Sequence, residues 1–98
     1  MVKHIVLLKM KPGTSGETVK RIFDALAALK GKIDGIEDFV WGAYSSDEGL
    51  NKGFTHGFIM TFRDARSRDE YLPHPEHEKV KEMILPVVDD VLAFDFEC

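Results

Sequence analysis

Three of the chain's four histidines and one of its two tyrosines lie in the stretch between residues 54 and 77. In the first part of this stretch, large apolar side chains alternate with small or polar ones, as they do on the two faces of a β-strand. His56 therefore shares a face with Phe54, Phe58, Met60 and Phe62. A titratable ring on an apolar wall suits a ligand pocket, and it equally suits a hydrogen-bonded histidine in a core. The residues alone leave both interpretations open.

The histidine spacing argues against a catalytic metal. His74 and His77 are three residues apart, which can suit ligation, but Pro75 lies between them and no third ligand is evident. The single cysteine, Cys98, belongs to no nucleophile or metal motif, and the scattered glycines form no phosphate-binding loop. We therefore predict no cofactor from these residues.

Size and composition indicate one globular domain spanning residues 1–98. The formal net charge of −4, with no basic block to offset it, argues against binding to nucleic acid. The apolar run at residues 5–8 is too short to span a membrane or to form the core of a signal peptide. With one cysteine and no internal disulfide, these features predict a cytoplasmic protein.

Hydrophobic periodicity predicts elements in the order β-α-β-β-α-β. Strands are expected over residues 2–11, 36–44, 54–62 and 91–97. A helix introduced by the capping-box pair Thr14 and Glu17 is expected to run to about residue 32. A second helical region should begin after the cap Asp64, break at Pro73, and resume with Pro75 as the first residue of another helix.

This order is typical of a ferredoxin-like α+β fold, in which an antiparallel sheet carries its helices on one face. We expect the opposite face to carry His4, His56 and several phenylalanines. A monomer would expose this apolar face to water, and we therefore expect a homodimer in which two sheets pack face to face.

Several segments spread along the chain share their order and spacing with a known family. They are Met1-Val-Lys-His-Ile-Val-Leu-Leu-Lys9, Val40-Trp-Gly42, Phe54-Thr-His-Gly57, Tyr71 and His74-Pro-Glu-His77. Together they resemble the stress-responsive dimeric α/β-barrel domain family. The resemblance implies a homodimer in which two four-stranded sheets close into a barrel. One member of this family is a plant polyketide cyclase that catalyses an intramolecular aldol condensation without an organic cofactor.

The resemblance also implies a set of site residues. The catalytic histidine of the cyclase corresponds to His77, and its partner tyrosine corresponds to Tyr71. The resemblance adds three ligand-binding histidines, which are His4, His56 and His74.

Two further correspondences concern the substrate and a bound ion. A pocket tyrosine of the cyclase falls on Leu26 here, so the resemblance does not carry over the substrate of the cyclase. Relatives also bind magnesium or a similar ion through main-chain carbonyls, which would correspond to Lys30, Ile33 and Ile36. Such a site leaves no side-chain pattern in a sequence.

The chemistry implied for the pair is acid–base catalysis. Histidine titrates near neutral pH, so His77 is suited to remove a proton from an activated carbon, and Tyr71 can donate a hydrogen bond to the carbonyl or enolate oxygen. The predicted function is a cofactor-free lyase or cyclase acting on a small apolar or aromatic carbonyl compound. The alternatives are a non-catalytic ligand-binding protein and a structural stress-responsive dimer in which Tyr71 only locks the loop around His77.

Overall fold

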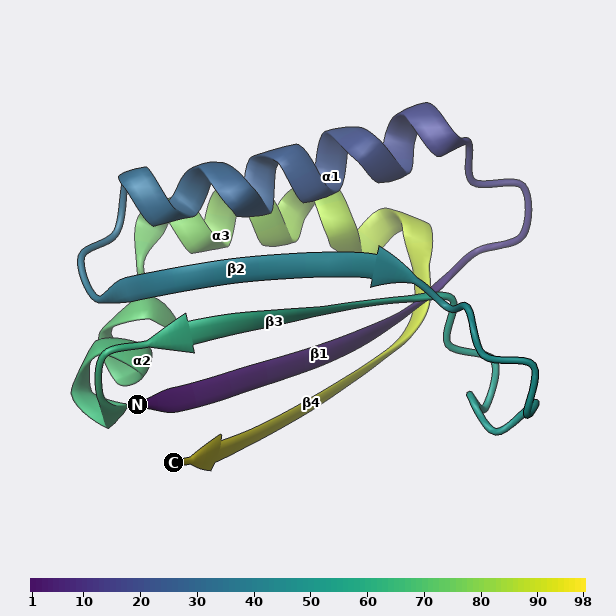
Figure 1. The fold of residues 1–98 in the computed structure, drawn as a ribbon. Coiled ribbons are helices and arrows are strands. Elements are labelled where there is room, and N and C mark those ends of the chain that lie inside the picture. Colours follow the sequence, from purple (N-terminus) through teal and green to yellow (C-terminus); the bar gives the residue numbers. More distant parts are fainter.

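A four-stranded antiparallel sheet, in the order β2-β3-β1-β4, carries its helices on one face (Figure 1). The computed structural model describes all residues from Met1 to Cys98. The elements are β1 (Val2–Met10), α1 (Gly16–Ala28), η1 (Leu29–Gly31), β2 (Ile36–Ala43), β3 (His56–Phe62), α2 (Ala65–Tyr71), α3 (Pro75–Ile84), η2 (Leu85–Val87) and β4 (Val88–Glu97). The predicted ferredoxin-like β-α-β-β-α-β order is confirmed.

The covered side of the sheet, here called the inner face, forms the core with the apolar stripe of α1. Every second residue of β1 from Val2 to Met10, His4 included, is buried on this side. From β3 the inner face receives Phe58, Met60 and Phe62. The prediction that the face of His4 and the phenylalanines lies opposite the helices is therefore wrong. Alternation shows which residues share a face, and both faces of β1 are apolar, so it does not show which face the helices cover.

The uncovered side, here called the outer face, is also apolar. Ile5 of β1 lies directly opposite Ile59 of β3 and Phe94 of β4, and Val40 of β2 lies opposite Ile59. Directly opposed residues in an antiparallel sheet project from the same face. Phe94 is 61% exposed and Val40 is 53% exposed. Figure 1 shows this side of the sheet without a covering helix.

Local side-chain hydrogen bonds determine the residue at which each helix begins. The cap of α1 is Ser15, whose hydroxyl accepts a hydrogen bond from the backbone of Thr18 at 3.1 Å. The predicted capping box is therefore wrong, because Thr14 turns its hydroxyl back to the carbonyl of Lys11 at 2.7 Å. The prediction for α3 is confirmed, since Pro75 is its first residue and its missing N–H costs the helix nothing there.

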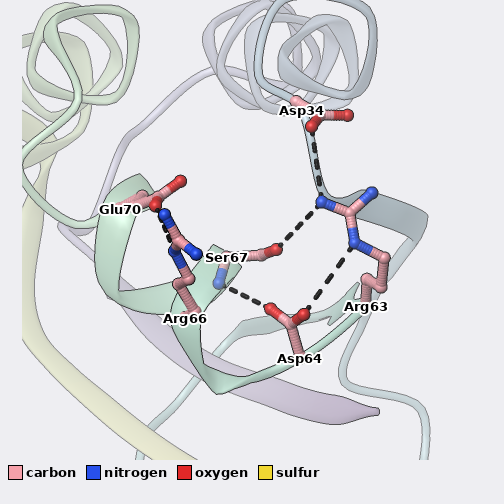
Figure 2. Close-up of polar contacts among 6 residues, drawn as sticks. All are labelled: Asp34, Arg63, Asp64, Arg66, Ser67 and Glu70. Carbon is pink, nitrogen blue, oxygen red and sulfur yellow. Dashed lines mark hydrogen bonds and ion pairs between the residues drawn. The ribbon is translucent and has the colours of Figure 1, made fainter.

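A polar cluster anchors α2 to the turn that precedes β2 (Figure 2). The carboxylate of Asp64 caps α2 by accepting a hydrogen bond from the backbone of Ser67 at 2.8 Å. The guanidinium of Arg63 bridges Asp34 and the Ser67 hydroxyl at 3.3 and 3.5 Å. The cluster fixes the helix that carries Arg68 and Tyr71.

Gly35 packs directly against this cluster, and we expect Gly35→Ala to destabilise the protein by about 1–3 kcal/mol. Its φ of +93° is unfavourable for alanine, and a Cβ there would lie 2.5 Å from the Ser67 side chain. Urea denaturation would measure the loss. Gly16→Ala is the matched control, because Gly16 has open space around it and begins α1. Equal stability of the two variants would contradict the prediction.

Candidate functional site

A pocket of about 300 Å³ lies between the inner face of the sheet and the helices α2 and α3. Most of its wall is apolar, and the few polar groups come from His4, Tyr71, His77 and Lys81. The apolar part of the wall is formed by Val6, Leu8, Leu26, Phe58, Leu72, Ile84, Leu85, Val91 and Ala93. An apolar cavity with a few convergent polar groups is the usual form of a small-molecule site.

The rings of Tyr71 and His77 stack in this pocket, with centroids 4.1 Å apart and planes inclined by 29°. The Nδ1 atom of His77 lies 2.9 Å from the backbone carbonyl of Leu72. A carbonyl can only accept, so Nδ1 carries the proton and donates it. In the neutral ring the lone pair then resides on Nε2, and this nitrogen is available as a base.

Burial tunes both members of the pair. Desolvation is the main cause of the lowered pKa of His77, and the charge of Lys81 adds to it, whereas the hydrogen bond to Leu72 opposes it. The imidazole is consequently neutral at neutral pH. Tyr71 is only 1% exposed, and burial raises the pKa of its phenol well above the ordinary value of 10.0. The phenol therefore keeps its proton and is suited to donate a hydrogen bond.

Two charged residues that the sequence analysis missed, Asp95 and Arg68, hold the His4 ring in place through hydrogen bonds. His4 and Asp95 are direct partners across β1 and β4, and Nδ1 of His4 donates to the carboxylate of Asp95 at 2.6 Å. Arg68 of α2 holds the second carboxylate oxygen at 2.8 Å. Burial works to raise the pKa of Asp95, but the hydrogen bonds from Arg68 and His4 outweigh it and lower that pKa. The ionised Asp95 fixes the orientation of the His4 ring, which approaches Tyr71 edge-on at 6.0 Å.

A signal for Asp95 was present in the sequence. The alternation of β4 places Asp95 on the same face as Ala93, opposite Phe94. A carboxylate among small inner-face residues requires a partner, and the antiparallel register supplies His4. Arg68 gave no such signal, because its position depends on how α2 packs against the sheet.

The structure brings together His4, Tyr71 and His77, and it places the other two candidate histidines elsewhere. His56, at the start of β3, bonds to the hydroxyl of Thr55 at 2.8 Å and lines a separate hollow beside the 44–55 loop. His74 is the cap of α3, and its Nδ1 accepts a hydrogen bond from the backbone of Glu76 at 3.1 Å. Neither residue lines the pocket of Tyr71 and His77.

The protein has no group of three histidine, cysteine or acidic side chains arranged to hold a metal ion. The carbonyl site implied by family resemblance lies elsewhere, from Lys30 in η1 through Ile33 to Ile36 at the start of β2. None of the backbone hydrogen bonds formed outside helices and strands ends on the carbonyl of Lys30 or Ile33. Carbonyl oxygens are ligands that a hard cation such as magnesium prefers, and this site stays a prediction.

The fold and pocket define a class of small α+β proteins with a ferredoxin-like sheet and a ligand-sized cavity under the helices. The chain belongs to the stress responsive A/B barrel domain family, whose model matches residues 2–98. The stress-response A/B barrel domain-containing protein HS1 of Arabidopsis thaliana is 34% identical over 96 residues, covering 98% of this chain and 88% of HS1. Olivetolic acid cyclase of Cannabis sativa is 25% identical over 95 residues, covering 97% of this chain and 94% of the cyclase.

Solved structures agree with this assignment. The crystal structure of At3g17210 from Arabidopsis thaliana superposes with a TM-score of 0.95 at 34% identity, covering 100% of this chain and 95% of that one. A dimeric ferredoxin-like protein of unknown function from Jannaschia sp. CCS1 superposes with a TM-score of 0.80 at 27% identity, covering 99% and 98% of the two chains. No helix of the present protein has the length and hydropathy needed to cross a membrane.

Proposed function

We propose that the protein is a cofactor-free lyase or cyclase that acts on a small apolar or aromatic carbonyl compound. The observation that carries this proposal is the stacked pair of Tyr71 and His77 in one apolar pocket, with the Nδ1 proton of His77 committed to Leu72. Base and hydrogen-bond donor thus border the same cavity. A relative with 25% identity, olivetolic acid cyclase, supports the choice of reaction class.

In the proposed reaction, Nε2 of His77 removes a proton from the carbon next to the substrate carbonyl. The electron pair of the broken C–H bond forms an enolate, and the Tyr71 hydroxyl donates a hydrogen bond to its oxygen. The enolate carbon then attacks a second carbonyl of the same molecule and forms the new C–C bond. The resulting alkoxide takes the proton back from His77, so the imidazole returns to its neutral form.

The apolar wall restricts the substrate. Leu26 of α1 lines the pocket where the family resemblance places a tyrosine in the cyclase. An apolar side chain offers no hydrogen bond to a substrate hydroxyl, and a substrate that buried one there would lose its bond to water. We therefore expect the part of the substrate facing α1 to be apolar.

Ligand binding without turnover is the second candidate. It is favoured by the apolar pocket wall, to which the Tyr71 ring can belong as a packed side chain, since it is 1% exposed and lies 4.9 Å from Phe62 between centroids. Such packing also occurs where an aromatic ring only fixes a loop.

A double mutant separates these two candidates. We expect Tyr71→Phe and His77→Ala each to lower the turnover of an aromatic β-polyketone, and the double variant to lose little more than His77→Ala alone. The reason is that both groups act on the same enolate, so their effects are not independent. Single-turnover kinetics would measure the three losses. Additive losses would refute the shared role, and altered affinity with no turnover in any protein would establish the binding function.

We also propose that the protein is a cytoplasmic homodimer that buries its outer face. The apolar residues of this face and the dimeric description of the Jannaschia protein support the assembly. The exposed, unpaired Cys98 is compatible with a reducing compartment.

A further inference from the structure

One residue of the pocket has no part in the proposed proton transfers. Lys81 lies one helical turn after His77 on α3 and borders the same cavity. It is the only lysine, arginine or carboxylate in the pocket wall. Leu72, Leu85 and Val91 of the same wall are 42%, 61% and 43% exposed, so this side of the pocket opens to solvent.

The ammonium group of Lys81 is available to a ligand. Its nearest acidic partner is Glu78, with Nζ and Oε1 2.9 Å apart. The two side chains are 42% and 50% exposed, and ion pairs with this exposure contribute little to stability. Lys79 on the same helix differs, because it pairs with Glu76 and does not border the pocket.

Position i+4 on a helix places Lys81 beside His77 on one face of α3. A carboxylate bound by Lys81 and a carbonyl facing His77 can therefore belong to a single small molecule. At about 30 Å³ per liquid water molecule, the cavity has room for a ligand roughly the size of ten waters. This is compatible with an aromatic or aliphatic body that carries one acidic end.

We propose that Lys81 selects an organic carboxylate, so that the ligand of this pocket is an amphipathic keto acid whose acidic end lies at the solvent side. This inference rests on the proposed function, since it assumes that the pocket accepts a small carbonyl compound. The ammonium would bind the carboxylate by a charge-assisted hydrogen bond, while the apolar body contacts Leu26, Phe58 and their neighbours.

The test compares two ligands of one shape, 5-phenylpentanoate and 5-phenylpentanamide, by isothermal titration calorimetry. Wild type should bind the acid about tenfold more tightly than the amide, the size expected for one charge-assisted hydrogen bond. Lys81→Met should remove this preference by weakening the acid alone. Lys81→Arg should keep it, and Lys79→Met is the control that removes an equal charge outside the pocket.

Glu78→Gln offers an independent variant, because it removes the competing carboxylate and should tighten binding of the acid. Equal affinities of wild type for acid and amide, or a preference that survives in Lys81→Met, would overturn the role of Lys81 and leave the pocket assignment intact. Failure of both ligands to bind any variant would overturn the ligand-binding pocket and this inference together.

Discussion

His77→Ala is expected to lower turnover of an aromatic β-polyketone by about 10²- to 10⁴-fold, the usual contribution of a positioned general base. The substitution removes the imidazole that stacks on Tyr71 from the first turn of α3, and with it the Nε2 nitrogen that is proposed as the base. It should spare the fold, because His77 is half-buried at a cavity wall and the core cluster does not include it.

The pH profile of wild-type activity provides a second test of His77 as the general base. A general base works in its neutral form, whose fraction grows as pH rises through the pKa of the folded protein. Burial lowers the pKa of His77 from its ordinary 6.5, so the rise of activity with pH should be centred below that value. Residual activity in His77→Ala should lack this rise.

His56→Ala is the matched control for the loss of an imidazole, because His56 lies outside the pocket. It should retain near wild-type turnover. A fully active His77→Ala protein would eliminate the catalytic assignment. An unfolded one would favour the structural alternative, in which His77 ties the turn between α2 and α3 to the rest of the fold.

Ile59→Asp is expected to convert the homodimer into a monomer, with the dissociation constant raised at least about 100-fold. Ile59 is the centre of the outer face, opposite both Ile5 and Val40. Burying one isoleucine contributes about 1.5–3 kcal/mol, and a twofold dimer contains each substitution twice. Every 1.4 kcal/mol changes the dissociation constant tenfold, so this loss of binding free energy is enough to dissociate a dimer that forms at micromolar concentration.

Sedimentation velocity would measure the change. Leu50→Asp is the control, since Leu50 is 66% exposed in the 44–55 loop and should leave the dimer intact. Phe58→Asp should behave differently from both, because Phe58 is buried in the core and its replacement should unfold the protein. A wild-type monomer at micromolar concentration, or a dimeric Ile59→Asp, would contradict the proposed interface.

Much of the fold could be predicted from periodicity and turn residues, because the strands and α1 each bury a regular set of side chains. The choice of Ser15 over Thr14 as cap, and of the inner over the outer face as core, could not be predicted in this way. Thr14 and Ser15 are neighbours of similar chemistry, and either could cap α1. Both faces of the sheet are apolar, and either could form the core.

Some residues of the candidate site could likewise be predicted from the sequence, and others could not. Tyr71 and His77 were assigned from a family resemblance, and the structure places their rings in contact. Arg68 and Lys81 enter the site through the packing of α2 and α3 on the sheet, which depends on contacts far apart in the chain. The pairing of Asp95 with His4 could be predicted, because the antiparallel register of β1 and β4 places the two residues opposite each other.

The break between α2 and α3 determines which nitrogen of His77 is basic. In an uninterrupted helix the N–H of Glu76 would bond to the carbonyl of Leu72, four residues earlier. Here the backbone N–H of Glu76 donates to Nδ1 of His74 instead, and the released Leu72 carbonyl accepts a hydrogen bond from the Nδ1–H of His77. His74 thus replaces Leu72 as the acceptor for the N–H of Glu76, and as a result the Leu72 carbonyl selects the Nδ1–H tautomer of His77. His74 can therefore influence proton transfer in a pocket that it never touches, purely through an exchange of hydrogen-bond partners along the chain.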